Sequence, residues 1–388
     1  MSKQYKLAYF VSHPIQYQAP LLKKISAEKN IDLHVFFLTN PATQNHTDKG
    51  FNTKIKWDTP LLDGYQYTFL NSKLKNQDYS LTNPSVKLCS VKNALEKEPW
   101  DAVWVHGYNN IALLYIIWRC VKTKTPLLFR AESNLLCSPQ NIKKNIFIKW
   151  LVKNCSGLLW IGQDNRDYYR HYGAAEKKLF FTPYAVDNVF FQDHGLKSIK
   201  PNTDERKCVL LFASKFIKRK QAPLLLEAFA QLAKPLRDQT ELWFVGDGPE
   251  RIILEQRINE LQLTNQVFLN GFLNQSELPS VISQCDVFIL PSEKEPYGLI
   301  INEVMNLAKP IITTDEVGAA RDLVEHKQNG WIIPARDVHA LTEALAEAVI
   351  NRESLSAMGK HSLDKINQWS FVEDIAGIQS ALRSIQPH

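Results

Sequence analysis

The sequence predicts an α/β protein with two parallel-sheet domains. Its 388 residues are too many for one small core and suit two domains. The stretch 287–320 reads as a strand–loop–helix–strand unit, with two apolar strands and a helix that stops before Lys309-Pro310. Residues 192–207 are polar and lack apolar periodicity, which indicates a domain boundary.

Composition excludes several classes of protein. Apolar residues make up 45% and charged residues 22% of the chain, as in ordinary globular proteins, and no apolar run is long enough to span a membrane. The N-terminus enters a strand at once and lacks a secretory pattern. Six scattered cysteines without a C-x-x-C pair predict reduced thiols in a cytoplasmic protein, with neither a zinc site nor a disulfide framework.

Charge divides unevenly along the chain. Up to Phe190 there are 25 Lys and Arg against 14 Asp and Glu, whereas the remainder has 21 against 26. No recognition-helix, zinc or RNA-binding pattern accompanies the basic half, so an anionic membrane surface or a phosphate-bearing acceptor fits better than nucleic acid. The basic helix 143–153 lies either on such a membrane or against the core with its lysines in water.

Apolar strands and amphipathic helices alternate through both halves. Strands are predicted over 7–11, 32–38, 65–70, 101–106, 126–130, 158–161, 208–213, 241–245, 267–269, 287–290 and 311–312. Helices are predicted over 86–95, 111–120, 143–153, 165–172, 224–229, 299–307, 341–350 and 369–385. This order predicts parallel sheets whose ligand-binding loops follow the carboxyl ends of the strands.

The polar loop of the strand–loop–helix–strand unit carries the strongest functional pattern. Gly298 allows close approach of the backbone to a ligand, and Leu299 and Ile300 place free N–H groups at a helix N-terminus, which suits a phosphate. Glu295 and Glu303 stand eight residues apart, so both can reach one elongated ligand and accept hydrogen bonds from sugar or ribose hydroxyls. The alternative is a solvated glutamate at each position.

The segment Pro-Ser-x-x-Glu-Pro-Tyr-Gly-Leu, with its Glu-x7-Glu spacing, resembles the signature of retaining glycosyltransferases of family 4. The resemblance implies the GT-B fold, two Rossmann-like parallel-sheet domains facing across a cleft. The expected parts are an N-terminal acceptor-binding domain (1–191), a linker (192–207), a nucleotide-sugar-binding domain (208–367) and a C-terminal helix crossing back to the first domain (368–388).

The resemblance also implies a donor site. In such a site Glu295 would contact the donor sugar and Glu303 would bind the ribose hydroxyls. Gly298 and the residues after it would hold the diphosphate. The loop after strand 208–213 resembles the family's Gly-Arg-x4-Lys-Gly element, so Lys215 and Lys220 would neutralise the diphosphate; solvent exposure is the alternative for this loop. The other expected donor-binding residues are Ser214, Gly246, Gly248, Gly271, Phe272, Leu273, Tyr297, Leu299 and Ile300.

His106 is the main candidate in the first domain. It ends strand 101–106, at the ligand-facing edge of the expected sheet. The strand resembles the family's Asp-x4-His pattern, whose histidine lies close to the reacting sugar. The alternative is a buried, hydrogen-bonded core histidine.

Two other strand ends carry candidates for the acceptor or the cleft. Arg130 and Glu132 follow strand 126–130, and they either face the ligand or pair with one another. The loop after the first strand resembles a His-Pro-Ile-Gln-Tyr variant of the family's first loop. His13, Gln16 and Tyr17 of this loop are candidates, with a structural loop histidine as the alternative for His13.

These observations predict a metal-independent retaining glycosyltransferase without a cofactor. It would move a sugar from a nucleotide-sugar, with a UDP-sugar favoured, to a glycan, glycolipid or lipid-linked acceptor in bacterial surface polysaccharide assembly. We expect a cytoplasmic protein whose basic first domain contacts an anionic membrane, and no nucleic-acid partner. A non-hydrolysing sugar-nucleotide epimerase of the same fold and a catalytically idle glycan-binding protein stay open as alternatives.

Overall fold

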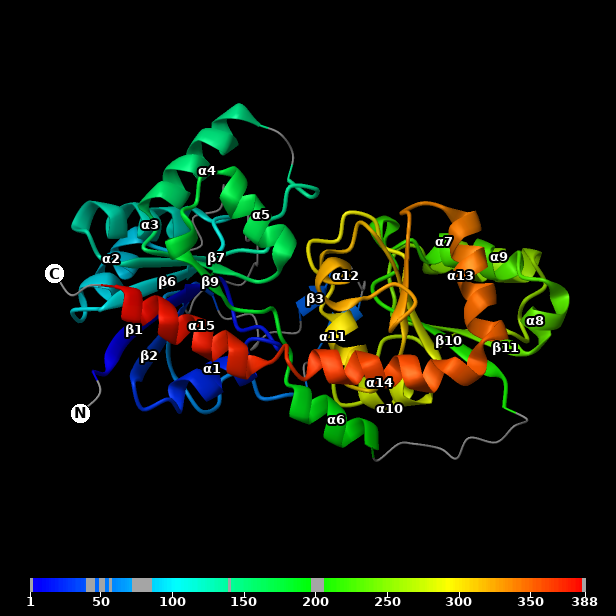
Figure 1. Ribbon diagram of the computed structural model, residues 1–388. Coiled ribbons are helices and arrows are strands. Elements are labelled where there is room, and N and C mark those ends of the chain that lie inside the picture. Colours follow the sequence, from blue (N-terminus) through cyan, green and yellow to red (C-terminus); the bar gives the residue numbers. More distant parts are fainter. Residues whose placement is uncertain are drawn as a thin grey trace. The chain divides into compact units, whose positions relative to one another are not determined.

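Two compact units make up the protein (Figure 1). The computed structural model describes residues 3–39, 46–48, 53–55, 58–71, 86–138, 141–196 and 206–385. Unit 1 comprises Met1–Gln44, Thr59–Asp187 and Ser370–His388, and unit 2 comprises Asn45–Asp58 and Asn188–Trp369. Each unit contains a parallel sheet packed against helices, which confirms the predicted α/β class with two parallel-sheet domains.

The described residues of unit 1 form a seven-stranded parallel sheet in the order β5-β2-β1-β6-β7-β8-β9. The strands are β1 (Tyr5–Val11), β2 (Ile31–Phe37), β5 (Gln66–Phe69), β6 (Ala102–His106), β7 (Leu127–Arg130), β8 (Gly157–Trp160) and β9 (Leu179–Phe181). Most are nearly continuous apolar runs, because helices cover both faces of the sheet. The order reverses between β1 and β6, and we call this position the reversal point of unit 1.

Two groups of helices cover this sheet (Figure 1). The helices α2 (Leu88–Glu96), α3 (Ile111–Thr123), α4 (Ile142–Asn154) and α5 (Gln163–His171) share one apolar core with the sheet. The helices α1 (Ala19–Ser26) and α15 (Phe371–Ser384) share the core on the other face. Phe371 and Ile378 of α15 pack there with Leu22 and Ile25 of α1, so the last helix of the chain completes unit 1.

A buried ion pair ties α15 to the sheet of unit 1. Asp374, in the first turn of α15, is fully buried, and its Oδ2 accepts a hydrogen bond of 3.0 Å from Arg130 Nη1 at the end of β7. Arg130 is 3% exposed and also donates to two backbone carbonyls. The alternative in which Arg130 pairs with Glu132 is therefore wrong, because α15 supplies a closer and fully buried carboxylate.

We expect Asp374→Ala to lower the free energy of unfolding by about 3–5 kcal/mol, because it leaves the Arg130 guanidinium buried without a counter-charge. Urea unfolding measures this loss. The matched control is Arg119→Ala, which breaks the more exposed pair with Glu96 in the same unit and should cost less than about 1 kcal/mol. Equal small losses in the two variants would contradict a stabilising role for the buried pair.

The described residues of unit 2 form a six-stranded parallel sheet in the order β12-β11-β10-β13-β14-β15. The strands are β10 (Cys208–Ala213), β11 (Thr240–Val245), β12 (Val267–Leu269), β13 (Val287–Leu290), β14 (Ile311–Thr314) and β15 (Gly330–Ile333). The order reverses between β10 and β13, the reversal point of unit 2. The short strands β3 (His46–Asp48) and β4 (Thr53–Ile55), which pair antiparallel with one another, also belong to unit 2.

Helices surround this second sheet (Figure 1). The α-helices are α6 (Asn188–Leu196), α7 (Ala222–Ala230), α8 (Lys234–Asp238), α9 (Arg251–Glu260), α10 (Leu278–Gln284), α11 (Ile300–Met305), α12 (Gly318–Leu323), α13 (Val338–Ile350) and α14 (Leu355–Ile366). Buried side chains of α7, α9 and α13 form the main apolar core with the sheet. In the described part of the whole chain, no helix is both long and apolar enough to cross a membrane.

The start of the expected linker differs from the structure. The division between the units falls between Asp187 and Asn188 rather than after residue 191, because α6 belongs to unit 2. Phe191 of α6 is fully buried, and α6 packs against α10. The polar composition of 192–207 concealed this helix, and residues 197–205 lie outside the described part of the chain.

The helix expected over 299–307 is shorter in the structure. It spans Ile300–Met305 as α11. Ala308 adopts φ +53°, the left-handed conformation that commonly ends a helix. A six-residue helix therefore separates the functional loop from β14.

Candidate active site

The reversal points of the two sheets carry the main candidates for the site. Loops that leave the carboxyl ends of parallel strands at such a point diverge to opposite faces of the sheet, and ligands bind in the crevice between them. In unit 1, His106 ends β6 beside β1. In unit 2, Lys220 follows β10 and Glu295 follows β13.

Lys220 and Glu295 meet at the reversal point of unit 2. Lys220 Nζ lies 2.5 Å from Glu295 Oε2, and Arg219 Nη1 donates to the same oxygen at 2.7 Å. Lys220 is 8% exposed and Glu295 is 7% exposed, whereas the side chain of Arg219 is 43% exposed. Arg219 thus connects the buried pair to the protein surface. The alternative of a solvated Glu295 is wrong.

The charges of these three side chains depend on one another. Burial by itself raises the pKa of Glu295, but the positive charges of Lys220 and Arg219 lower it by more, so the carboxyl group stays ionised. Burial lowers the pKa of Lys220, and the negative charge of Glu295 opposes that shift. Two cations around one carboxylate leave an excess of positive charge, which suits an anionic ligand such as a diphosphate.

Backbone contacts fix the position of Glu295. Its N–H donates to the carbonyl oxygen of Glu316 at 3.0 Å, and its own carbonyl accepts from the N–H of Gly318 at 3.1 Å. Gly318 has no room for a side chain, because a Cβ there would lie 2.3 Å from the carbonyl oxygen of Pro296. The functional loop is therefore tied to the start of α12.

Two expected donor-site glycines hold conformations and contacts that demand glycine. Gly246 has φ +134°, and a Cβ there would lie 1.9 Å from the carbonyl oxygen of Ser214. Gly246 also donates its N–H to the carbonyl of Gly271 at 2.7 Å. Gly298 has φ +101°, and a Cβ there would lie 3.1 Å from Val317 Cγ1. The loops after β10, β11 and β12 are thus drawn together by their backbones.

The start of α11 presents the groups expected from the sequence. Its first intrahelical hydrogen bond runs from Glu303 N to Leu299 O, so the N–H groups of Leu299 and Ile300 precede the helical ladder. Burial raises the pKa of Glu303 to about 8, so its carboxyl group is mostly protonated at neutral pH. A protonated carboxyl both donates to and accepts from a ligand hydroxyl.

The remaining expected donor residues lie on loops at the same edge of the sheet. They are Ser214 and Lys215 after β10, Gly248 after β11, Gly271, Phe272 and Leu273 after β12, and Tyr297 before α11. Tyr297 is 3% exposed, so its ring supports the loop from within. Unit 2 therefore brings all the expected donor residues to the carboxyl ends of four neighbouring strands.

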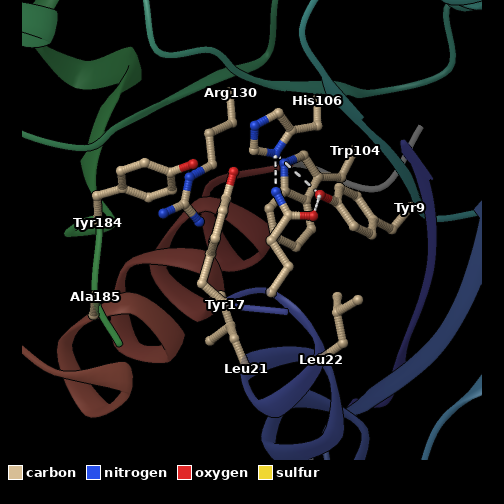
Figure 2. Close-up of a pocket in the computed structure, with 10 residues that line it drawn as sticks. Tyr9, Tyr17, Leu21, Leu22, Trp104, His106, Arg130, Tyr184 and Ala185 are labelled. Carbon is tan, nitrogen blue, oxygen red and sulfur yellow. Dashed lines mark hydrogen bonds between the residues drawn. The ribbon is translucent and has the colours of Figure 1, made fainter. Parts of the chain in front are cut away.

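His106 is the polar centre of the reversal point in unit 1 (Figure 2). Its Nδ1 lies 3.0 Å from the hydroxyl oxygen of Tyr9 and 3.2 Å from Nε2 of Gln18. The amide nitrogen of Gln18 can only donate, so Nδ1 accepts and the neutral ring carries its proton on Nε2. Burial, Arg130 and His13 lower the pKa of His106 to about 3. The ring is therefore neutral near pH 7.

Glu132 and Tyr17 lie beside His106. Oε1 of Glu132 is 4.0 Å from His106 Nε2, and it accepts hydrogen bonds from the hydroxyls of Tyr17, at 3.4 Å, and Tyr184. In Figure 2 the Tyr17 and Tyr184 side chains converge near Arg130 and His106. The structure thus joins Tyr17, Glu132 and His106 in one cluster, whereas Arg130 lies in the wall beneath with Asp374 as its partner.

His13 and Gln16 lie on the loop after β1. Both are partly exposed, and His13 Nδ1 lies 2.9 Å from Ser12 Oγ. His13 also contributes to the lowered pKa of His106, which places the loop near the cluster. Their expected contact with an acceptor stays a prediction.

The pocket inward of this cluster is nearly filled by side chains. Its volume is about 10 Å³, which is room for about one water molecule. It is lined by Tyr9, Tyr17, Gln18, Leu21, Leu22, Trp104, His106, Arg130, Tyr184 and Ala185 (Figure 2). A ligand of unit 1 would therefore lie outside this pocket, on the exposed side of Glu132.

Four residues of these clusters were not predicted from the sequence. Arg219 belongs to a run of three cations after β10, and that run was a usable signal. Tyr9, Gln18 and Tyr184 gave no comparable signal, because their roles depend on neighbours that the fold supplies. Tyr9, for example, reaches His106 across 97 residues of sequence because β1 and β6 are adjacent.

We expect stability to fall in acid because of His106. Its folded-state pKa of about 3 lies below the ordinary 6.5, so the unfolded state takes up a proton first as the pH falls. The contribution of His106 is complete above about pH 6.5 and is lost toward pH 3, with a loss of about 3 kcal/mol by about pH 4. Urea unfolding of the wild type and His106→Gln from about pH 8 to about pH 4 measures this. Parallel pH profiles would contradict the buried neutral state.

The fold and the two reversal points define a class of protein. Two Rossmann-like parallel-sheet units with polar loops at the carboxyl ends of their strands constitute the GT-B fold. HepE from Anabaena, solved in complex with UDP, has the same fold, with a TM-score of 0.72 and 17% identity over 98% of this chain and 100% of that one.

Residues 196–364 match the family described as Glycosyl transferases group 1. Alpha-D-kanosaminyltransferase of Streptomyces kanamyceticus is 27% identical over 154 residues, 40% of this chain and 39% of that protein. Lipopolysaccharide core biosynthesis glycosyltransferase LpsD of Rhizobium meliloti is 32% identical over 158 residues, 40% of this chain and 44% of that protein. The aligned part thus spans about two fifths of these curated relatives.

Proposed function

We propose that the protein is a retaining glycosyltransferase of family 4 that binds a nucleotide-sugar at the reversal point of unit 2. The observation that carries this proposal is the contact of Lys220 with Glu295, inside the segment that matches Glycosyl transferases group 1. Cations complement a diphosphate, and a carboxylate accepts hydrogen bonds from sugar hydroxyls. The pair can therefore bind both the diphosphate and the sugar of a nucleotide-sugar.

In this proposal the diphosphate of the donor replaces Glu295 as the ionic partner of Lys220 and Arg219. The released carboxylate of Glu295 then accepts hydrogen bonds from the donor sugar, so that phosphate binding and sugar orientation are coupled. Glu303, with its raised pKa, exchanges hydrogen bonds with the ribose hydroxyls. We favour a UDP-sugar as the donor, and the solved complex of HepE with UDP supports this choice.

The proposed reaction exchanges one bond at the anomeric carbon of the donor sugar for another. The bond to the diphosphate oxygen breaks and its electron pair stays with the diphosphate. The acceptor oxygen bonds on the same face, and its proton passes to the departing phosphate. The cationic side chains Lys215, Arg219 and Lys220 stabilise the charge that develops on the diphosphate. We propose metal independence because these groups supply the charge that a divalent metal supplies in other transferases.

The proposed acceptor is a glycan, glycolipid or lipid-linked sugar of a bacterial surface polysaccharide. The name of LpsD, a lipopolysaccharide core biosynthesis glycosyltransferase, supports this class of acceptor. The free thiol state of all six cysteines supports a cytoplasmic setting for the reaction.

We expect Lys220→Ala and Glu295→Ala each to reduce sugar transfer by about 100-fold or more, because each removes a preorganised group that contacts the donor. Release of UDP from UDP-sugars measures transfer, and a thermal shift with UDP measures binding. Lys218→Ala, which removes an exposed neighbouring cation, is the matched control and should keep full activity.

Wild-type activity in both site variants would overturn the assignment of this site. A UDP thermal shift that requires a divalent metal, and disappears with EDTA, would contradict metal independence. Interconversion of two nucleotide-sugars without an acceptor would favour the epimerase instead.

We also propose that α4 rests on the membrane that carries the acceptor. Ile142, Ile146 and Trp150 recur every four residues along α4 and are 80%, 64% and 36% exposed. Exposed lysines lie among them, at Lys143, Lys149 and Lys153. Apolar side chains enter the interface of a bilayer while lysines meet anionic headgroups, so this helix suits an anionic membrane surface.

We expect Ile142→Ser/Ile146→Ser to weaken binding to phosphatidylglycerol vesicles by about tenfold or more, because each isoleucine loses apolar burial in the interface. Vesicle sedimentation measures the bound fraction. The matched control is Ile252→Ser/Ile253→Ser on α9 of unit 2, where the two isoleucines are 65% and 52% exposed. Equal binding by both double variants would rule out docking through α4.

A further inference from the structure

The cluster around Glu132 in unit 1 has its own binding chemistry. We propose that Glu132, Tyr17, Tyr184 and His106 form a subsite for a neutral sugar, whose hydroxyl groups bind between the Glu132 carboxylate and His106 Nε2. That this sugar is the acceptor of the transfer rests on the proposed function. The existence of the subsite rests on the contacts within unit 1 alone.

One oxygen of Glu132 is held by the protein and the other is open. The hydroxyls of Tyr17 and Tyr184 both donate to Oε1. Burial raises the pKa of both tyrosines, so they stay protonated as donors. Within the described residues no hydrogen bond reaches Oε2 of Glu132, whose side chain is 40% exposed. The second oxygen can therefore accept from a ligand on the solvent side.

His106 supplies a donor next to this acceptor. Tyr9 and Gln18 occupy Nδ1, which leaves the Nε2 proton directed away from them, with Nε2 4.0 Å from Oε1 of Glu132. A sugar hydroxyl both accepts and donates, so it can accept from Nε2–H and donate to Glu132 at the same time. An ionised phosphate oxygen accepts only, and its negative charge would be repelled by the carboxylate.

The charge of the subsite also disfavours an anionic ligand. Arg130 lies beside the cluster, with its Cζ 5.4 Å from the centroid of the Tyr184 ring, and its counter-charge is Asp374 within the core. His106 is neutral and Glu132 faces solvent, so the exposed charge here is negative. The basic excess of the first half lies elsewhere, for example on α4. In this proposal a phosphate-bearing acceptor reaches the cluster with its sugar and not with its phosphate.

The aromatic rings fit a sugar as well. Tyr17 and Tyr184 meet edge to face, with ring centroids 5.3 Å apart and planes at 83°. Tyr184 is buried, whereas Tyr17 is partly exposed and offers ring surface to the apolar C–H groups of a sugar. The inward pocket holds only about 10 Å³, so the sugar lies across Tyr17 and Glu132 rather than inside this pocket.

Saturation-transfer NMR on the full chain tests this subsite with three neutral probes, the methyl α-glycosides of glucose, galactose and mannose. We expect at least one probe to bind the wild type, and Glu132→Gln to weaken it on the order of tenfold, because an amide oxygen replaces a charged acceptor. Tyr184→Phe, which removes one of the two donors to Oε1, should weaken binding of the same probe. Glu96→Gln changes an exposed carboxylate of the same unit and is the matched control.

Three results would each overturn the subsite: no probe binds the wild type, Glu132→Gln and Tyr184→Phe both bind as well as Glu96→Gln, or inorganic phosphate displaces the probe. A thermal shift with UDP, recorded on the same samples, separates this proposal from the proposed function. Probe binding without a UDP shift would contradict the proposed transferase function but support the subsite. A UDP shift without probe binding would contradict the proposed subsite alone.

Discussion

Parallel strands bring all their carboxyl ends to one edge of a sheet, and both candidate sites depend on this constraint. Lys220 and Glu295 are 75 residues apart in sequence, yet their side chains meet because β10 and β13 are neighbours at the reversal point. Tyr9 and His106 meet in the same way on β1 and β6. With another strand order every helix and strand could form, and neither cluster would exist.

Two buried ion pairs in this protein show how electrostatic balance separates a structural contact from a binding site. Arg130 and Asp374 are matched one to one, and backbone carbonyls take further hydrogen bonds of the guanidinium. Glu295 instead faces two cations, Lys220 and the partly exposed Arg219. The charges of the first pair balance without a ligand, whereas the second keeps an excess of positive charge at the surface.

Unit 1 presents two different surfaces, one basic and one suited to sugar hydroxyls, which the net charge of the sequence does not distinguish. Lysines and two exposed isoleucines lie along α4, which suits a membrane. Its reversal point instead presents a carboxylate, tyrosine hydroxyls and a neutral imidazole, which suit sugar hydroxyls. A lipid-linked glycan has both features, a membrane-anchored end and a neutral sugar to be extended. The two proposed surfaces therefore address different parts of one class of molecule.

The sequence by itself determined the α/β class, most strands, and the loops that hold Glu295 and Lys220, because apolar periodicity and residue spacing are local properties. Only the tertiary structure decided which side chains meet. Asp374 reaches Arg130 across 244 residues, and Tyr184 reaches Glu132 across 52, through helix packing and strand order that no local pattern encodes. It also decided that α6 belongs to unit 2, since burial of Phe191 depends on α6 packing within that unit.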